Sequence, residues 1–428
     1  MARLAGFIAA SGVALVAASA AHAGGFYLQE QGVRGTGRAY SGEVADTGVE
    51  SLWWNPASIA DSGTEVYAGA NAIFVPGSVT DRGSTITFPG GLTVPSGGDP
   101  RATDPIENGV APNLGGALRL GDRFTIGFST AAPFNLTTAY IPNSWTRYDA
   151  LKSRIFTADG QGTVAMRATP WLDLGVGIDL QYVAARLTNA LPNLVPGAPD
   201  GLQGLSGHGW DWGWTAGAQA HFGRLSLGAS YRSSIRHDLK GTAAVVGLVG
   251  PLAGANFVGP GGAAFSTPWI ATFGARYRVS DQLTLDAQVQ RFGWSEFGAI
   301  DVSSLGGPQV VPENYRDTTS GGAGLDYALS PKLTLRTGFQ YDPTPTASTG
   351  PDARVPDGNR WLFAAGASAK VSHNITLDAA FAYIDFQSST ISRTAAFYTG
   401  TPAATVAQLT GEAEGAGYVL SLGARMAW

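Results

Sequence analysis

The sequence of 428 residues contains no cysteine, and only 14% of its residues are charged. A disulfide scaffold, a cysteine zinc site and a thiol nucleophile are therefore excluded. The formal net charge of −5 argues against nucleic-acid binding, which needs a basic face to displace counterions from phosphates. Beyond residue 23, no stretch approaches 18 consecutive apolar residues, so we expect no transmembrane helix there.

The chain is rich instead in glycine (59 residues) and in tryptophan (11 residues), and its hydrophobic fraction of 44% excludes a disordered chain. After Arg3 comes a small and apolar run from Leu4 to Ala21, followed by an A-x-A site that ends at Ala23. This pattern predicts a secretory signal peptide over residues 1–23, cleaved after Ala23. An uncleaved anchor is the less favoured reading, because the run contains mainly Ala and Gly rather than Leu and Ile.

An exported chain of this kind is either a soluble β-protein or an outer-membrane barrel, and period-2 alternation favours the barrel. At the end of the chain, Tyr418, Leu420 and Leu422 share one face, and Ser421, Gly423 and Arg425 share the other. The chain also ends on an aromatic residue, Trp428, and in this it resembles the terminal β-signal of outer-membrane barrels.

The same alternation predicts fourteen strands, an even number that returns both chain termini to one side of the membrane. The strands are expected at residues 64–75, 114–120, 123–130, 156–169, 171–186, 210–222, 224–233, 268–279, 282–292, 318–329, 332–342, 360–371, 374–386 and 417–428. Tight turns such as Gly121-Asp122 and Ser330-Pro331 alternate with long loops. The loops are expected at residues 134–155, 188–209, 234–267, 293–317, 343–359 and 387–416.

Side-chain parity assigns the faces of these strands. In residues 332–342 the leucines and aromatic residues alternate with polar and charged residues, so the first set is expected to face lipid. An Arg or Lys that faces lipid at the midplane costs about 2 to 4 kcal/mol, and an Asp somewhat less, so we expect Arg276, Arg336, Asp286 and Asp378 to point into the lumen. Arg186 departs from this rule, because even positions of its strand face lipid. We therefore expect it above the apolar band, at the level of lipopolysaccharide.

Residues 24–63 precede the first strand and do not alternate, and we expect the barrel over residues 64–428. Asn55-Pro56 is typical of a turn, because proline fixes φ and lacks an N–H donor. Nonpolar residues in this segment, including Phe26, Trp53 and Trp54, favour folding into the lumen as a plug. An ordinary N-terminal extension is the alternative.

Residues 24–60 read GGFYLQEQGVRGTGRAYSGEVADTGVESLWWNPASIA, and this segment resembles the N-terminal hatch of the FadL-type outer-membrane transporters for long-chain fatty acids and other hydrophobic compounds. The resemblance continues through APFNLTTAY, WTRYDALKS, YRSSIRHDLKG, GWSEF, NYRD, RTGFQYDPTP and PDGNRW, and so it covers essentially the whole mature chain. It implies an all-β fold, a 14-stranded antiparallel transmembrane β-barrel with the hatch in its lumen, and a kink in the third strand that opens a lateral hole.

The resemblance also implies passive, hatch-gated uptake across the bacterial outer membrane, without a cofactor and without enzymatic activity. Expected partners are long-chain fatty acids or small hydrophobic molecules, together with the surrounding outer-membrane lipid and lipopolysaccharide. We expect a monomer that binds no nucleic acid. Within the family, an aromatic hydrocarbon channel is the alternative.

Particular residues match the family's motifs. Phe26 falls where relatives have an aromatic residue close to the tight pocket, although a purely packing role is an equal alternative. Asn55, Pro56 and Ala57 match the hatch motif and are expected to fix the turn that joins the hatch to the wall. Ala131, Ala132 and Pro133 end the third strand, either beside the lateral opening or at an ordinary strand end. Pro133 removes a ladder donor.

Four residues are candidates for contact with a ligand head group: Arg316 in NYRD, Asp342 in QYDPTP, and Arg336 and Arg276, which are chosen from inward parity. For each of them, a lumenal salt bridge or a hatch anchor is the alternative and is favoured over direct ligand contact.

Two other functions compete with this reading. A general porin would keep its lumen open, which the hatch argues against. An outer-membrane enzyme would need a Ser-His pair. The sequence places His221 inward near a periplasmic turn with no evident acid or serine partner, and it places His208 and His237 in extracellular loops. Metal ligands at suitable spacing are also missing, so we expect no metal site.

Overall fold

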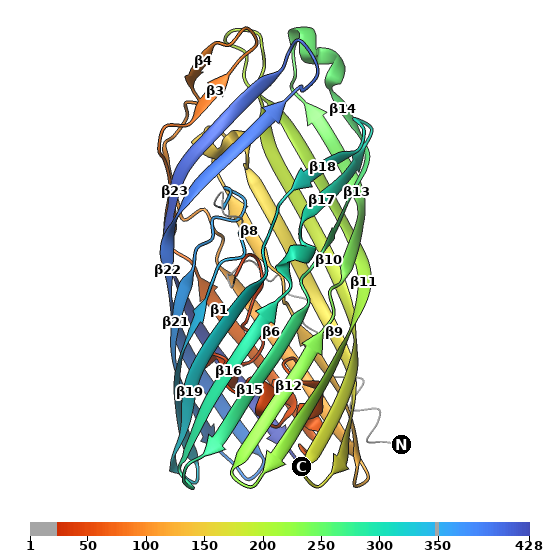
Figure 1. The fold of residues 1–428 in the computed structure, drawn as a ribbon, viewed down its shortest axis with the longest axis vertical. Helices are drawn as coiled ribbons and strands as arrows, with labels where there is room; N and C mark the ends of the chain where they lie inside the picture. Colours follow the sequence, from red (N-terminus) through yellow and green to blue (C-terminus); the bar gives the residue numbers. More distant parts are fainter. Residues whose placement is uncertain (1–23, 347–350) are drawn as a thin grey trace.

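The computed structural model describes residues 24–346 and 351–428. The predicted signal peptide, residues 1–23, lies outside the described residues. The described chain forms a tall, closed antiparallel β-barrel (Figure 1), in which the first wall strand pairs with the last. No helix among the described residues is long and apolar enough to cross a membrane.

Fourteen strands of the described chain form the wall, which confirms the predicted fold. In order around the barrel they are β1 (Glu65–Phe74), β6 (Gly109–Leu120), β7 (Phe124–Ala131), β9 (Lys152–Thr169), β10 (Leu172–Leu191), β11 (Gly201–Phe222), β12 (Leu225–Arg232), β15 (Ile270–Arg278), β16 (Leu283–Phe292), β19 (Thr318–Ser330), β20 (Leu333–Asp342), β21 (Arg360–Lys370), β22 (Ile375–Phe397) and β23 (Thr405–Ala427). Each strand pairs with the next, and β23 pairs with β1.

The predicted long loops were wrong in extent, because much of their sequence continues the sheet above the membrane. β10 and β11 remain paired up to Leu191 and Gly201, and β22 and β23 up to Phe397 and Thr405. Above the bilayer a strand keeps its ladder hydrogen bonds but no longer needs one apolar face, so alternation fails as a signal. The other strands in these segments are β8 (Leu136–Ala139), β13 (Arg236–Val246), β14 (Phe257–Ser266), β17 (Ala299–Ser304) and β18 (Gln309–Pro312). Four more short strands lie between β1 and β6: β2 (Gly77–Asp81), β3 (Thr85–Thr87), β4 (Thr93–Pro95) and β5 (Arg101–Thr103).

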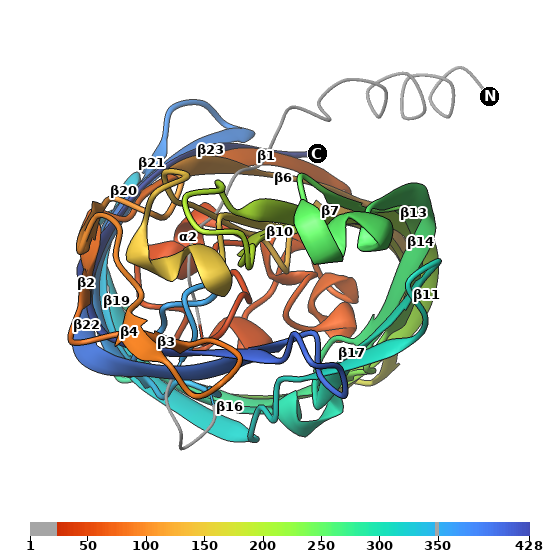
Figure 2. The same cartoon turned by 90° about the horizontal axis from the view of Figure 1, so that it is seen from above.

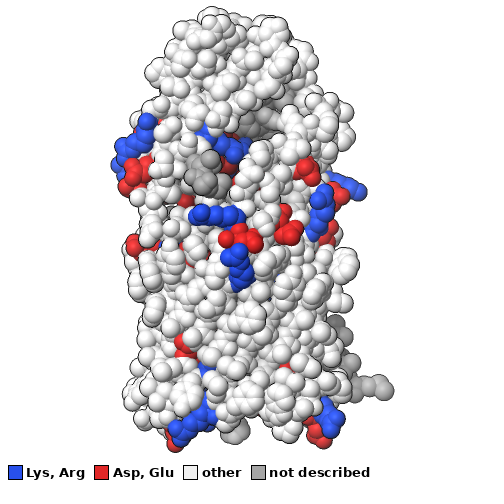
Figure 3. Space-filling model, in the orientation of Figure 1, with Lys and Arg blue, Asp and Glu red and all other residues white. Residues whose placement is uncertain are grey.

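Burial alternates along the wall strands as the parity argument predicts. On β20, Arg336, Gln340 and Asp342 are buried, whereas Leu335 and Phe339 are exposed on the outer face. On the side of the molecule shown in Figure 3, charged side chains lie mainly at the lower rim and in the upper half, with a largely uncharged surface between them. This arrangement suits a wall that faces lipid in its lower half, between these two charged levels, and faces water above and below that band.

The N-terminal segment lies inside the ring of strands when the barrel is viewed along its axis (Figure 2). It contains one turn of α-helix, α2 (Val33–Thr36), and three 3-10 helices: η2 (Glu43–Ala45), η3 (Val49–Ser51) and η4 (Pro56–Ile59). Nearly every residue from 24 to 60 is buried. We call residues 24–63 the hatch segment.

Candidate functional site

The lower lumen holds a network of ion pairs between the hatch segment and the wall. Arg38 is fully buried and pairs with Glu43 and Asp46 of its own segment and, at 3.0 Å, with Asp326 of β19. Arg276 of β15 contacts the same two aspartates, Asp46 at 3.0 Å and Asp326 at 2.8 Å. The hatch segment is thereby tied to strands on one side of the barrel.

Two of the head-group candidates belong to this network. Arg276 binds Asp46 and Asp326, and Arg336 of β20 lies 3.1 Å from Asp326 and donates to Ser368. Both guanidinium groups are therefore occupied by protein partners. Their geometry favours the salt-bridge and hatch-anchor reading over contact with a ligand.

Asn55, Pro56 and Ala57 contact a further part of the wall, on β10 and β11. The Asn55 side chain accepts from the amide of Ala57 at 2.9 Å, which caps η4, and it donates to the carbonyl of Ala218 on β11 at 3.1 Å. The approach is close enough that a Cβ on Gly175 of β10 would lie 2.3 Å from the backbone of Pro56. Glycine at this wall position is what lets the motif dock.

An aromatic cluster, which we call the chamber cluster, fills the middle of the lumen around Phe26. The Phe26 ring meets Trp294 and Phe297 at 5.0 Å, Phe134 at 5.9 Å and Tyr315 at 6.3 Å between ring centroids. Most of these contacts are edge-to-face, the geometry that aromatic quadrupoles prefer. The hatch segment, the third strand and the segment between β16 and β19 therefore meet at Phe26.

Asp342 lies beside this cluster, where it holds the start of the hatch segment. The amide of Gly24 donates to Asp342 Oδ2 at 3.0 Å, and the amide of Gly25 donates to Asp357 at 2.8 Å. Arg360 of β21 is buried between the two acids and binds Asp342 at 2.8 Å. The structure thus brings Asp342 close to Phe26, but as an anchor that already has partners.

Arg316 does not join this group. It follows the buried Tyr315 in the chain, but its own side chain is exposed, and its backbone amide donates to the carbonyl of Pro345. Adjacent residues in extended backbone point in opposite directions, which explains why Tyr315 enters the chamber and Arg316 does not.

The third wall strand is interrupted at the residues expected for the lateral opening. β7 ends at Ala131 and β8 begins at Leu136, and both strands pair with β9. Ala131 is opposite Asp159 and Leu136 is opposite Ile155, so the third strand carries one residue more than its partner. On its other side, the ladder between β6 and β7 ends at Leu114 and Thr130.

The hatch segment supplies hydrogen-bond partners to this interruption from the inside. Leu28 donates its amide to the carbonyl of Pro133 at 2.7 Å, and Asn135 donates its amide to the carbonyl of Phe26 at 3.0 Å. The side-chain oxygen of Gln31 accepts from the amide of Ala132 at 3.2 Å. The hatch segment therefore lies directly behind the break in the wall.

A cavity that is partly open to solvent lies above the chamber cluster, between the upper parts of β10, β11, β13 and β14. Its lining is almost entirely apolar and includes Leu187, Leu239 and Phe265. Phe265 is 5.8 Å from Phe297, which in turn contacts Phe26. A series of aromatic rings thus connects the cavity with the interrupted strand.

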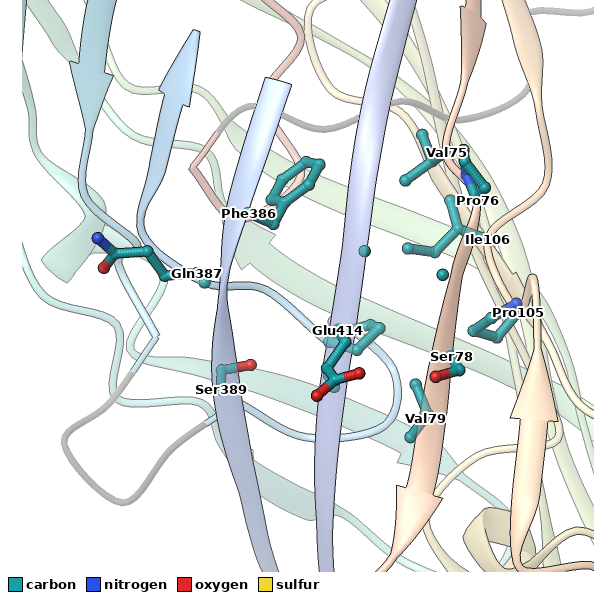
Figure 4. Close-up of a pocket in the computed structure, with 15 residues that line it drawn as sticks. Val75, Pro76, Ser78, Val79, Pro105, Ile106, Phe386, Gln387, Ser389 and Glu414 are labelled. Carbon is teal, nitrogen blue, oxygen red and sulfur yellow. The ribbon is translucent and has the colours of Figure 1, made fainter. Parts of the chain in front are cut away.

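A second cavity, also partly open to solvent, lies at the bulge of β22 (Figure 4). Val75, Ile106 and Phe386 line one part of it, and Ser78 and Glu414 line another. Ile106 and Phe386 also pack against the buried hydrophobic core to which the chamber cluster belongs.

An acidic and basic cluster in the outer segments lies near Tyr315. Arg354 contacts Glu313 at 3.6 Å and Asp149 at 3.7 Å. Burial and the neighbouring Asp352 together raise the pKa of the Glu313 carboxyl to about 8, while Arg354 opposes the shift.

His221 has partners that its sequence context did not reveal. Its Nε2 lies 3.0 Å from Asp173 and its Nδ1 lies 3.2 Å from Ser226 Oγ, so the expectation of no acid or serine partner was wrong. The three residues lie on neighbouring strands and come together only through register. β12 is paired on both sides, so its amides near Ser226 are used in ladders and form no oxyanion hole.

His237 also differs from its expected loop position. It is fully buried on β13 and contacts Asp211 at 3.0 Å, whereas His208 is exposed on β11. In the part of the chain that the structure describes, no three His, Asp or Glu side chains are grouped so as to hold a metal ion.

Several chamber residues were missed by sequence reasoning: Phe134, Trp294, Phe297, Tyr315 and Arg360. Each lies inside a family-like motif, APFNLTTAY, GWSEF, NYRD or PDGNRW, and all except Arg360, which begins the predicted strand 360–371, lie outside a regular alternating segment. The motifs marked these positions, and alternation could not show which way their side chains point.

The sequence is similar to a known protein family over almost its whole length. The family described as "Outer membrane protein transport protein (OMPP1/FadL/TodX)" matches residues 14–428. Outer membrane protein P1 of Haemophilus influenzae is 25% identical over 86% of this chain and 88% of its own length. The long-chain fatty acid transport protein of Escherichia coli K12 is 25% identical over 88% of this chain and 91% of its own length.

Solved structures show the same fold. A FadL homologue from Pseudomonas aeruginosa superposes with a TM-score of 0.82 at 22% identity, over 94% of this chain and 99% of the other. The Pseudomonas putida toluene transporter TodX superposes with a TM-score of 0.66 at 17% identity, over 93% of this chain and 98% of the other. The chain therefore belongs to the OMPP1/FadL/TodX family of transport proteins of the bacterial outer membrane.

Proposed function

We propose that this protein takes up long-chain fatty acids or other small hydrophobic molecules by passive diffusion. The ligand enters the apolar cavity below the outer hairpins, passes along the chamber cluster and leaves sideways at the interrupted third strand. The observation that carries this proposal is the ring series from Phe265 through Phe297 and Phe26 to Phe134, which joins the cavity to the break in the wall.

The chemistry of such ligands explains why a plain pore would not serve. A hydrophobic molecule partitions poorly into a water-filled channel, so it needs apolar binding surfaces and an exit into lipid. The hatch segment occupies the lower lumen and is ion-paired to the wall, which argues against a general porin.

Movement of the hatch segment is the gating step in this proposal. A ligand that displaces Phe26 also pulls on Leu28, whose amide holds the carbonyl of Pro133. Both polar atoms of the Gln29 side chain are buried without a partner in the described part of the chain. Burying unpaired polar atoms costs about 1 to 3 kcal/mol, which lowers the cost of moving this segment.

The names of the relatives support both ligand classes. One relative is a long-chain fatty acid transport protein, and one protein of the same fold is a toluene transporter. The chamber cluster supplies apolar surface that suits an acyl chain and an aromatic ring alike. The buried cations beside it, Arg360 and Arg354, already have acidic partners. The binding experiment described next therefore uses fatty acids and alkylbenzenes separately.

Replacing Phe26 with alanine should weaken ligand binding about tenfold. Loss of about 60 Å² of apolar contact corresponds to roughly 1.5 kcal/mol at 25 cal/mol per Å². The measurement is displacement of a fluorescent fatty acid from the purified protein, with oleate in one arm and an alkylbenzene in the other.

Phe363→Ala is the matched control, because Phe363 is 49% exposed on the outer face of β21. We expect it to bind both ligands as the unmodified protein does. Unchanged affinity of Phe26→Ala for both ligand classes would reject the chamber as the binding site.

A further inference from the structure

A patch of basic side chains lies on the outer wall above the lipid-facing band. Arg154 of β9 and Arg186 of β10 are directly opposite each other in the ladder. His208 of β11 lies level with Ala184, two residues before Arg186 on β10, and it is opposite Lys240 of β13. All four side chains are exposed. We call Arg154, Arg186, His208 and Lys240 the basic patch.

The cations of the basic patch have no acidic partner within 4 Å among the described residues, whereas four other outward cations of the upper half do. Lys152 pairs with Glu107 at 3.0 Å, Arg236 with Asp301 at 3.7 Å, Arg291 with Asp317 at 3.4 Å and Arg82 with Glu412 at 2.7 Å. Asp238 is the nearby outward acid, two residues before Lys240 on β13. The two arginines and the lysine of the basic patch therefore outnumber this one acid.

Like charges directly opposite each other in a sheet destabilise it. Arg154 and Arg186 are such a pair, and the Arg154 guanidinium also lies 5.6 Å from the ring of Phe156 on the same face. A bound anion would turn this repulsion into attraction, because it can accept hydrogen bonds from both guanidinium groups. The pair is therefore suited to an anionic ligand from outside the chain.

The position of the patch relative to the membrane indicates which anion it meets. Tyr182 and Trp210 lie just below it, 5.2 Å apart, and Tyr182 is 6.2 Å from His208. From Leu172 to Tyr182 the strand rises about 33 Å, or roughly 25 Å along the barrel axis at the usual tilt, which matches the apolar band of such barrels. Arg186, four residues further on, stands about 10 Å higher.

An aromatic girdle with unpaired cations directly above it is suited to a lipid whose acyl chains end at a phosphate. Below the girdle, Ile178 and Leu180 are more than half exposed, and they offer an apolar surface to acyl chains. Arginine forms paired hydrogen bonds with phosphate oxygens, and lysine adds a mobile point charge.

We propose that the basic patch binds a phosphate of lipid A, the phosphorylated, multiply acylated anchor of lipopolysaccharide in the outer leaflet. Arg154 and Arg186 hold the phosphate between them, Lys240 completes its charge balance, and the acyl chains lie on Phe156, Tyr182 and Trp210. This site lies outside the lumen, so a result that rejects it would leave the proposed transport function unaffected.

The test uses the mature protein in phosphatidylcholine nanodiscs, titrated with lipid A and followed by native mass spectrometry. The triple variant Arg154→Gln, Arg186→Gln, Lys240→Gln should lower lipid A affinity at least 30-fold. The matched control removes three outward cations that have acidic partners, by Arg82→Gln, Lys152→Gln and Arg236→Gln, and should change affinity less than threefold. Arg186→Gln alone, expected to lower affinity about fivefold, gives a readout if the triple variant folds poorly.

Two further probes separate phosphate recognition from its alternatives. Dephosphorylated lipid A should bind the unmodified protein as weakly as intact lipid A binds the triple variant, and inorganic phosphate should not compete at millimolar concentration. Equal binding of the dephosphorylated lipid would overturn the proposal, because the aromatic girdle alone would then suffice. Competition by inorganic phosphate, or equal losses in the triple variant and the control, would overturn it as well.

Discussion

Arg38→Met should release the hatch segment and convert a closed barrel into an open channel. Arg38 is fully buried and pairs with Glu43, Asp46 and Asp326, so its removal leaves the buried Glu43 without its cation and takes one of several cations from Asp46 and Asp326. Breaking a buried ion pair by removing one partner costs about 3 to 5 kcal/mol. Since 1.4 kcal/mol is a tenfold change, the undocked fraction should rise more than 100-fold. Single-channel recording in planar bilayers should then show large, steady currents.

Arg82→Met is the control for this experiment. Arg82 also pairs with an acid, Glu412, but its side chain is 56% exposed, and exposed pairs contribute about 0 to 1 kcal/mol. Its conductance should remain that of the unmodified protein. If Arg38→Met stays closed while the barrel is intact, the ion pairs of Arg38 do not hold the hatch segment in place.

Closing the break in the third strand should abolish uptake without unfolding the barrel. The strand has one residue more than β9 between the pairs Ala131–Asp159 and Leu136–Ile155. Deleting Ala132 puts both pairs in one register and leaves Leu136 on the same inward face as Ala131. Adding Pro133→Val restores a ladder donor. Uptake of labelled fatty acid by cells should fall at least tenfold.

The single change Pro133→Val is the matched control, because it keeps the extra residue. This variant should retain most of its uptake, and heat-modified migration in electrophoresis should show that both barrels are folded. Full uptake by the deletion variant would show that ligands do not leave at this position.

The wall of the barrel could be predicted from its sequence for a physical reason. Between the two rims of the barrel, one face of every strand contacts lipid and the other faces the lumen, so Leu335 and Phe339 alternate with Arg336 and Gln340. This constraint ends at the outer edge of the bilayer. There the prediction failed, and β11 begins at Gly201 rather than near Trp210.

The candidate site was predictable only where a residue lies on a wall strand or in a recognised motif. Parity placed Arg276 and Arg336 in the lumen, but it could not show that Asp46 and Asp326 already bind them. Those partners come from segments far apart in the sequence. Asp173, His221 and Ser226 meet for the same reason, because a contact across three strands depends on register and not on spacing along the chain.

The central claim is that a hydrophobic ligand leaves through the wall beside Pro133 and not through the lower end of the barrel. A fatty acid with a terminal diazirine, activated by light in cells and mapped by mass spectrometry, tests this most directly. We predict that cross-links fall on Ala132, Pro133 and the chamber cluster. Cross-links confined to the ion-paired lower lumen around Arg38, or to the periplasmic turns, would contradict lateral exit.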